Sequence, residues 1–270
     1  MMTNEEKFNT ERFDHPGASY QAVTTEITEN NEHRIILTDV TSENIEKKGK
    51  FIPEFQSELK SRIVEMPESI YKASGIKILG KRIKSLLFTT DVAIINNSNA
   101  QSVIAVYPFT PQLTIMQSIV NVASVPVFLG VGGGTTTGQR SVDLAFQAEQ
   151  MGAYGVIVNA PMKKEVITQI NKRIDIPVIA TIASDKDDYI TKLNAGADML
   201  NVSAGASTVE LVRKIRQEVG PMVPIIATGG PTEESILETI QAGANAITYT
   251  PPTSAEIFAE VMVKYRGLSN

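Results

Sequence analysis

Four residues with acid–base or amide chemistry each follow a short apolar run in this chain. Asp91 and Tyr107 close two of these runs, and Asn159 and Asn201 close two others. A carboxylate or a phenol can transfer a proton, so Asp91 and Tyr107 are candidate catalytic residues. An unpaired amide at the end of a buried strand is costly, so Asn159 and Asn201 are candidates for ligand contact in a catalytic site. Asp91 has two other interpretations, as a metal ligand or as the N-cap of the next helix.

A glycine-rich loop at residues 130–138 is the most unusual stretch of the chain. Consecutive glycines expose backbone N–H groups, and a following helix N-terminus favours an anion. The loop lacks the Gly-Lys-Ser/Thr ending of a P-loop. We therefore expect it to bind an anion or a substrate, with a flexible turn as the alternative. The predicted ligand-binding residues here are Gly132, Gly133, Gly134 and Thr135.

Two further turns combine small residues with a helix start and are candidates for the same anion. Residues 203–207 read Ser-Ala-Gly-Ala-Ser, and residues 228–230 read Thr-Gly-Gly. Glu233 and Glu234 follow the second turn and oppose a phosphate there. The ligand-binding residues that we predict in these turns are Ser203, Gly205, Thr228, Gly229 and Gly230.

Several kinds of chemistry are missing from the expected site. The chain has no cysteine, and its two histidines, His15 and His33, lie far upstream of these turns. A thiolate nucleophile and a Cys-ligated metal are therefore excluded, and a His-based triad would need the N-terminal segment to reach the site. We predict no metal site, and the sequence assigns no cofactor.

The elements that must position these residues recur along the chain. Pro126, Pro177 and Pro224 each open an apolar run rich in β-branched residues, at intervals of about 50 residues. Each run leads through a turn into a helix that ends near a glycine and then into another apolar run. This arrangement is typical of parallel strands buried on both faces and alternating with helices.

From residue 84 onward the pattern gives eight strand–helix units, which predicts a (β/α)8 TIM barrel with its active site at the C-terminal ends of the strands. A doubly wound open sheet is the structural alternative. Residues 84–270 form the predicted barrel, and residues 1–83 form an N-terminal extension that is partly flexible or a dimer arm. Helix starts are predicted at Thr110, Ser184, Ser207, Thr232 and Thr253.

The composition limits the classes of partner that the protein can bind. The 270 residues are 42% hydrophobic, enough for a sizeable core, and carry a net charge of −5. Such a charge argues against nucleic acid and anionic membranes as partners. No apolar run is long enough to span a bilayer and no signal peptide is recognised, so we expect a cytoplasmic protein that binds a small molecule and can form a homo-oligomer.

The stretch Pro-Ile-Ile-Ala-Thr-Gly-Gly-Pro at 224–231, with Ala-Gly-Ala-Asn-Ala at 242–246, resembles the phosphate-binding TIM barrels. These include the ribulose-phosphate-binding, keto-deoxy-phosphogluconate aldolase-like and nitronate monooxygenase-like families. Over residues 62–266 the chain is similar to bacterial TIM-barrel proteins that carry only a provisional hydrolase label. The segments that carry this likeness are residues 73–91, 106–111, 130–135 and 246–252.

This resemblance implies an enzyme, provisionally a hydrolase, that acts on a small anionic metabolite, with a phosphorylated one as the leading class. Asn201 stands near the place where Schiff-base aldolases of this shape carry a lysine, which argues against imine chemistry. The histidine base of nitronate monooxygenases is also missing from the barrel. The alternatives are a non-catalytic sensor of a small ligand and a flavin-binding barrel.

Overall fold

The computed structural model describes residues 21–27, 33–39 and 63–267, and the chain divides into two compact units, Met1–Ile63 and Val64–Asn270. In the first unit, β1 (Gln21–Ile27) pairs with β2 (His33–Asp39) as an antiparallel hairpin with Gln21 opposite Asp39. Residues 1–20, 28–32 and 40–62, which include most of the predicted flexible segment, lie outside the described ranges. The second unit begins at Val64 and so includes a segment ahead of the first barrel strand.

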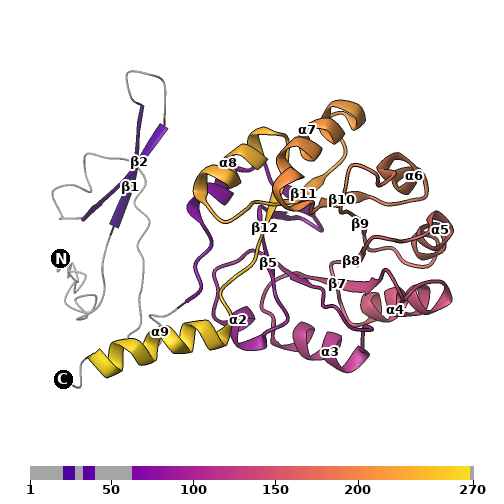
Figure 1. The fold of residues 1–270 in the computed structure, drawn as a ribbon, viewed down its shortest axis with the longest axis horizontal. Helices are drawn as coiled ribbons and strands as arrows, with labels where there is room; N and C mark the ends of the chain where they lie inside the picture. The colour runs from indigo at the N-terminus through magenta and orange to yellow at the C-terminus, as the bar shows by residue number, and fades with distance from the viewer. Residues whose placement is uncertain (1–20, 28–32, 40–62, 268–270) are drawn as a thin grey trace, which may run out of the picture. The chain divides into compact units, whose positions relative to one another are not determined.

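The second unit contains a closed parallel barrel, which confirms the TIM-barrel prediction and rules out the open sheet (Figure 1). The first strand pairs with the last, since Ile247 lies opposite Ser85 and closes the cylinder. The strands in chain order are β5 (Ser85–Phe88), β6 (Val103–Ala105), β7 (Val127–Gly132), β8 (Gly155–Val158), β9 (Val178–Ile182), β10 (Met199–Val202), β11 (Ile225–Thr228) and β12 (Ala246–Tyr249).

Helices follow the strands and surround the barrel (Figure 1). Most of them cover the outer face of the strands because apolar residues recur every three or four positions, as with Leu211, Val212 and Ile215 in α7. The last helix buries none of its residues. The helices are α2 (Val92–Asn96), α3 (Leu113–Val122), α4 (Gln139–Gln150), α5 (Lys164–Asn171), α6 (Tyr189–Asn194), α7 (Thr208–Val219), α8 (Glu233–Gln241) and α9 (Ser254–Gly267), with short 3-10 turns η3 (Glu68–Lys72) and η4 (Gly205–Ser207).

The barrel interior is closed at the end where the strands begin. A hairpin of β3 (Ile76–Ile78) and β4 (Lys81–Ile83) runs directly into β5 and contributes Ile76, Ile78 and Ile83 to the interior apolar cluster. These side chains pack with inward residues of the strands, such as Phe128 and Ile157, which are fully buried. The opposite end, where the strands finish, is therefore the open mouth.

The structure confirms some of the predicted helix starts and corrects others. Thr232 caps α8 through a reciprocal pair with Ser235, and Thr253 does so for α9 with Glu256, as expected. The predictions at Thr110 and Ser184 are wrong, because α3 starts at Leu113 and α6 takes Asp188 as its cap. Ser207 precedes α7, but its side chain makes no capping bond, so the predicted capping box with Glu210 does not form.

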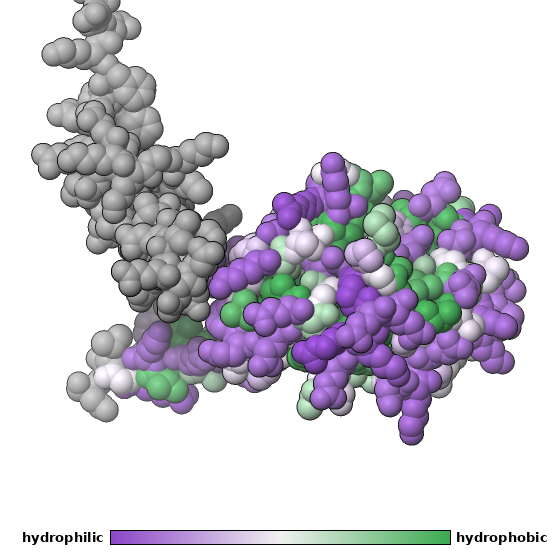
Figure 2. All heavy atoms as spheres, turned by 90° about the horizontal axis from the view of Figure 1, so that it is seen from above, coloured by the Kyte–Doolittle hydropathy of each residue, from purple (hydrophilic) through white to green (hydrophobic). Residues whose placement is uncertain are grey.

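The surface of the second unit is mixed in polarity. In the view of Figure 2, hydrophilic residues dominate and hydrophobic ones form small patches between them. Among residues 21–27, 33–39 and 63–267, no helix combines the length and apolar character that crossing a membrane requires.

Candidate functional site

A polar layer lies above the apolar interior, toward the mouth. Side chains alternate along a strand, so the residues two positions beyond the inward apolar ones also point inward. Beyond Ile157, Ile179, Met199, Ile226 and Ala246 in the interior cluster, this rule gives the layer Asn159, Thr181, Asn201, Thr228 and Thr248. The inner wall of the mouth on the β8–β12 side is thus built from amides and hydroxyls.

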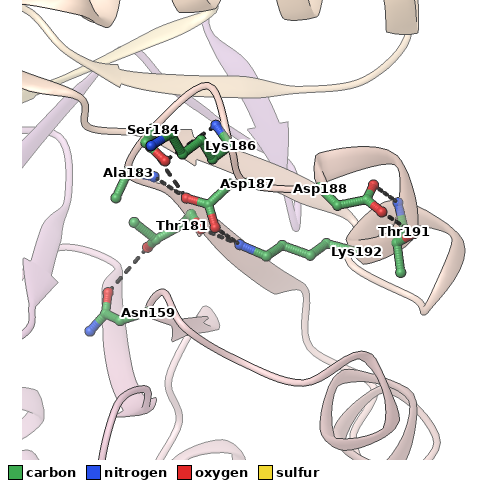
Figure 3. A network of polar contacts seen from close by, with 9 residues as sticks. All are labelled: Asn159, Thr181, Ala183, Ser184, Lys186, Asp187, Asp188, Thr191 and Lys192. Atoms are coloured by element: carbon green, nitrogen blue, oxygen red, sulfur yellow. Dashed lines mark hydrogen bonds and ion pairs between the residues drawn. The ribbon is translucent and has the colours of Figure 1, made fainter.

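The structure brings Asn159 and Asn201 together through Thr181. The Thr181 hydroxyl donates to Asn159 Oδ1 at 3.1 Å and accepts from Asn201 Nδ2 at 3.3 Å (Figure 3 draws the first bond). Asn201 Oδ1 and Thr248 Oγ1 are buried and have no hydrogen-bond partner. Each such atom carries a desolvation penalty of about 1–3 kcal/mol. Thr181 is a residue that sequence reasoning missed, because a buried threonine inside an apolar run gives no signal of its own.

A buried ion pair supports this polar layer from behind β9. Lys192 Nζ donates to the Thr181 carbonyl at 3.0 Å and lies 3.1 Å from Asp187 Oδ1 (Figure 3). Asp187 Oδ2 accepts the N–H groups of Ala183 and Ser184 at 2.8 and 3.2 Å. Burial raises the pKa of the Asp187 carboxyl, but these N–H groups and Lys192 outweigh it and hold the pKa below its usual value. The pair therefore fixes the end of β9, where Thr181 sits.

The glycine-rich loop packs against Asn159, and two of its backbone N–H groups are hydrogen-bonded within the protein. Gly133 N–H donates to the Thr136 carbonyl at 2.8 Å, and Gly134 N–H donates to the Pro161 carbonyl at 3.1 Å. The expectation that these two N–H groups are free to bind an anion is therefore wrong. The loop needs glycine at Gly133 because its φ is 138° and an added Cβ would lie 2.6 Å from Asn159 Cβ.

A hollow of about 180 Å³ opens beside this loop. No carboxylate and no basic side chain lines it, and its donors are neutral. Tyr107 Oη accepts the Gln112 N–H at 2.7 Å, which leaves the phenolic proton available. Asn159 keeps its Nδ2 group, and Thr135 adds a hydroxyl. The lining residues are Val106, Tyr107, Pro108, Phe109, Pro111, Gly130, Gly132, Gly133, Gly134, Thr135, Thr136, Asn159 and Ala160.

Asp91 lies at the end of β5, but it does not line this hollow. Its Oδ1 caps α2 by accepting the N–H groups of Ala93 and Ile94, and its Oδ2 accepts the Ser254 hydroxyl. The Ser254 hydroxyl is the largest cause that lowers the pKa of Asp91, and the two N–H groups lower it further. Both carboxylate oxygens of Asp91 are thus engaged in hydrogen bonds that hold the local structure.

The other predicted ligand-binding residues lie on the opposite side of the mouth. Thr228 donates to the Ser203 hydroxyl at 3.1 Å, so the ends of β10 and β11 are linked. Gly229 N–H donates to the Thr248 carbonyl, and a Cβ there would lie 2.7 Å from Ile236 and Ile247. Gly205 and Gly230 take φ values of 59° and 81°. Thr228 and Gly230 line a hollow on this side, which is separate from the one beside the glycine-rich loop.

A metal centre held by protein side chains alone does not fit this site. Within residues 63–267, no three His, Cys, Asp or Glu residues lie close enough together to hold an ion.

Comparison with family models and with curated protein sequences gives no match. Solved structures resemble the chain over most of the barrel. Oxaloacetate acetylhydrolase has a TM-score of 0.54 at 13% identity, and the match covers 70% of this chain and 82% of that protein. The 2,3-dimethylmalate lyase of the PEP mutase/isocitrate lyase superfamily has a TM-score of 0.52 at 12% identity, with coverages of 74% and 82%. Phosphonopyruvate hydrolase, solved with oxalate and Mg²⁺, has a TM-score of 0.51 at 13% identity, and the match covers 68% of this chain and 80% of that protein. At these identities the likeness shows the fold alone.

Proposed function

We propose that the protein is an enzyme that binds a small anionic metabolite in the hollow beside the glycine-rich loop. The observation that carries the proposal is the lining of this hollow, which offers hydroxyl and amide donors and contains no carboxylate. This is the feature that an anion needs on a chain of net charge −5. The volume of about 180 Å³ favours a compact carboxylate or phosphate.

Tyr107 and Asn159 are the residues to which we assign chemistry. They approach the hollow from the ends of β6 and β8, and Asn159 is held by the Thr181 hydroxyl. Neutral donors at fixed positions stabilise negative charge that develops on a substrate oxygen. Hydrolysis of a small anion is the reaction class that the sequence resemblance favours, with Tyr107 as the donor to the charged oxygen. The likeness to an acetylhydrolase and a phosphonopyruvate hydrolase agrees with this class at the level of the fold.

Replacing Tyr107 by phenylalanine is expected to weaken the binding of small anions about threefold to tenfold, because one donor is lost from the hollow. Calorimetric titration with oxalate, pyruvate and inorganic phosphate measures this effect. Tyr154→Phe is the matched control, since Tyr154 packs against the interior cluster and Lys81, away from the mouth. Equal affinities for Tyr107→Phe and the wild type, or no binding of any of these anions at millimolar concentration, would refute the proposed site.

A non-catalytic ligand-binding protein is the second candidate. It is favoured by the engagement of both Asp91 oxygens in capping α2 and binding Ser254. Turnover or its absence in a substrate screen separates the two candidates, and Asp91→Asn tests whether Asp91 takes part in any chemistry without breaking the fold, because asparagine caps a helix as well as aspartate does. If Asp91 is the acid or base of an enzyme, turnover of substrates found in a screen of small phosphorylated and carboxylated metabolites should fall about 100-fold or more. Unchanged turnover would remove Asp91 from the chemistry, and unchanged ligand binding without any turnover would support the sensor.

A further inference from the structure

A second and larger hollow lies on the other side of the mouth, where β11 and β12 end and α9 begins. Its volume is about 630 Å³, which is within the range of small-molecule sites. It lies where the turn at residues 228–230 was expected to bind phosphate. The lining residues are Thr228, Gly230, Pro231, Thr248, Tyr249, Thr250, Pro251, Pro252, Glu256 and Glu260.

The charge of this hollow is the opposite of what a phosphate needs. Glu256 and Glu260 line it, and no lysine, arginine or histidine does. Residues four apart share one face of a helix, so the two carboxylates lie side by side and repel each other. The Thr253 N–H holds the pKa of Glu256 below its usual value, which keeps that carboxylate ionised. The described residues give Glu260 no hydrogen bond and no ion pair.

An unpartnered polar side chain lies in the wall of the same hollow. Thr248 is 7% exposed, and its Oγ1 has no hydrogen-bond partner. Its neighbour Ile247 packs into the cluster outside the barrel, so Thr248 points inward, toward the mouth. A buried hydroxyl without a partner is costly, and a ligand that hydrogen-bonds to it removes the cost.

We propose that this hollow binds a small organic cation with a primary ammonium group. Two carboxylates without a counter-charge attract a cation, and an ammonium group donates three hydrogen bonds, to carboxylates and to hydroxyls. A single metal ion fits less well, since the hollow is far larger than an ion and its wall includes three prolines and Tyr249. No third metal-ligating residue joins the two glutamates within the described ranges.

The test is calorimetric titration of the full-length protein with 1,4-diaminobutane, with 1,4-butanediol as the neutral probe of the same length. We expect the diamine to bind, the diol to bind at least tenfold more weakly, and added salt to weaken the diamine. Glu260→Gln should reduce diamine affinity about threefold to fivefold. The control Glu165→Gln removes one charge from the remote helix α5 and should leave the affinity unchanged.

The variant Thr248→Val separates a loss of diamine binding from a loss of folding. Valine has the shape of threonine without the unpartnered hydroxyl, so the thermal midpoint of the ligand-free protein should stay equal or rise, while diamine affinity falls about threefold or more. Equal binding of diamine and diol, absence of diamine binding at millimolar concentration, or full affinity in Glu260→Gln would overturn the proposal. Saturable binding of Mg²⁺ with no binding of the diamine would overturn it in favour of a metal site.

Discussion

Replacing Gly133 by alanine is expected to destabilise the protein by more than about 3 kcal/mol, or to prevent folding, through backbone strain and overpacking together. Gly133 has a φ of 138°, a conformation that L-residues rarely adopt. Its added Cβ would also lie 2.6 Å from Asn159 Cβ and 2.7 Å from the Asn159 carbonyl oxygen. Rotation of the Asn159 side chain relieves neither contact, because Cβ and the carbonyl oxygen do not move with the side-chain torsions.

Gly134→Ala is the matched control in the same loop. Gly134 has a φ of 62°, and an added Cβ meets nothing within 4 Å. Only the left-handed conformation is penalised, so we expect a loss of about 1–2 kcal/mol. Urea denaturation of both variants measures the difference. Similar losses in the two variants would show that the glycine run is a flexible turn and that its packing against Asn159 contributes little.

The close approach at Gly133 also links the loop to the proposed anion site. Asn159 N–H donates to the Gly132 carbonyl at 2.8 Å, so the loop and the Asn159 backbone form one hydrogen-bonded unit. Glycine is needed here for positioning, because it lets the loop reach the residue that lines the hollow. The sequence predicted a loop with exposed backbone donors, whereas the structure shows that Gly133 is needed for close packing against Asn159.

The barrel could be predicted from sequence because its signals are local. Each strand is a short apolar run, often opened by a proline and followed within a few residues by a turn, and these features need no knowledge of distant contacts. The capping pairs at Thr232 and Thr253 are equally local, since both partners lie within one helical turn. By contrast, Thr110 and Ser184 have the right residue types, but the chain continues as an irregular loop to Gln112 and Asp188.

The polar network of the site could not be predicted, because its partners are far apart in the chain. Thr181 meets Asn159 and Asn201 across neighbouring strands. The hairpin that closes the barrel and the acidic hollow beside α9 also depend on how distant segments pack. The acidic net charge and the neighbouring Glu233 and Glu234 opposed a phosphate near the end of β11, but the presence of Glu256 and Glu260 in one hollow with Thr248 required the fold.

Asp187→Asn is expected to destabilise the protein by about 3 kcal/mol, because it leaves Lys192 without its counter-charge in a buried position. The side chains of Lys192 and Asp187 are only 9% and 19% exposed. Lys192→Met should cost less, about 1–3 kcal/mol, because methionine fills the space and the Asp187 carboxylate left behind is the more exposed partner and keeps its two backbone N–H bonds. The double variant should lose less than the sum of the two, because the second change removes the charge that the first left unpaired.

The pH dependence gives an independent check on this ion pair. The pKa of Asp187 in the folded protein lies below its usual value. Its contribution to stability is therefore fully present above the unfolded pKa of about 3.9 and is lost as the pH falls through the lower folded pKa. Urea denaturation at pH 7 and pH 3 should show a smaller loss of stability for Asp187→Asn than for the wild type, because asparagine does not titrate. An equal loss in both proteins would mean that other carboxylates carry the acid sensitivity and that the pair behind Thr181 adds little to it.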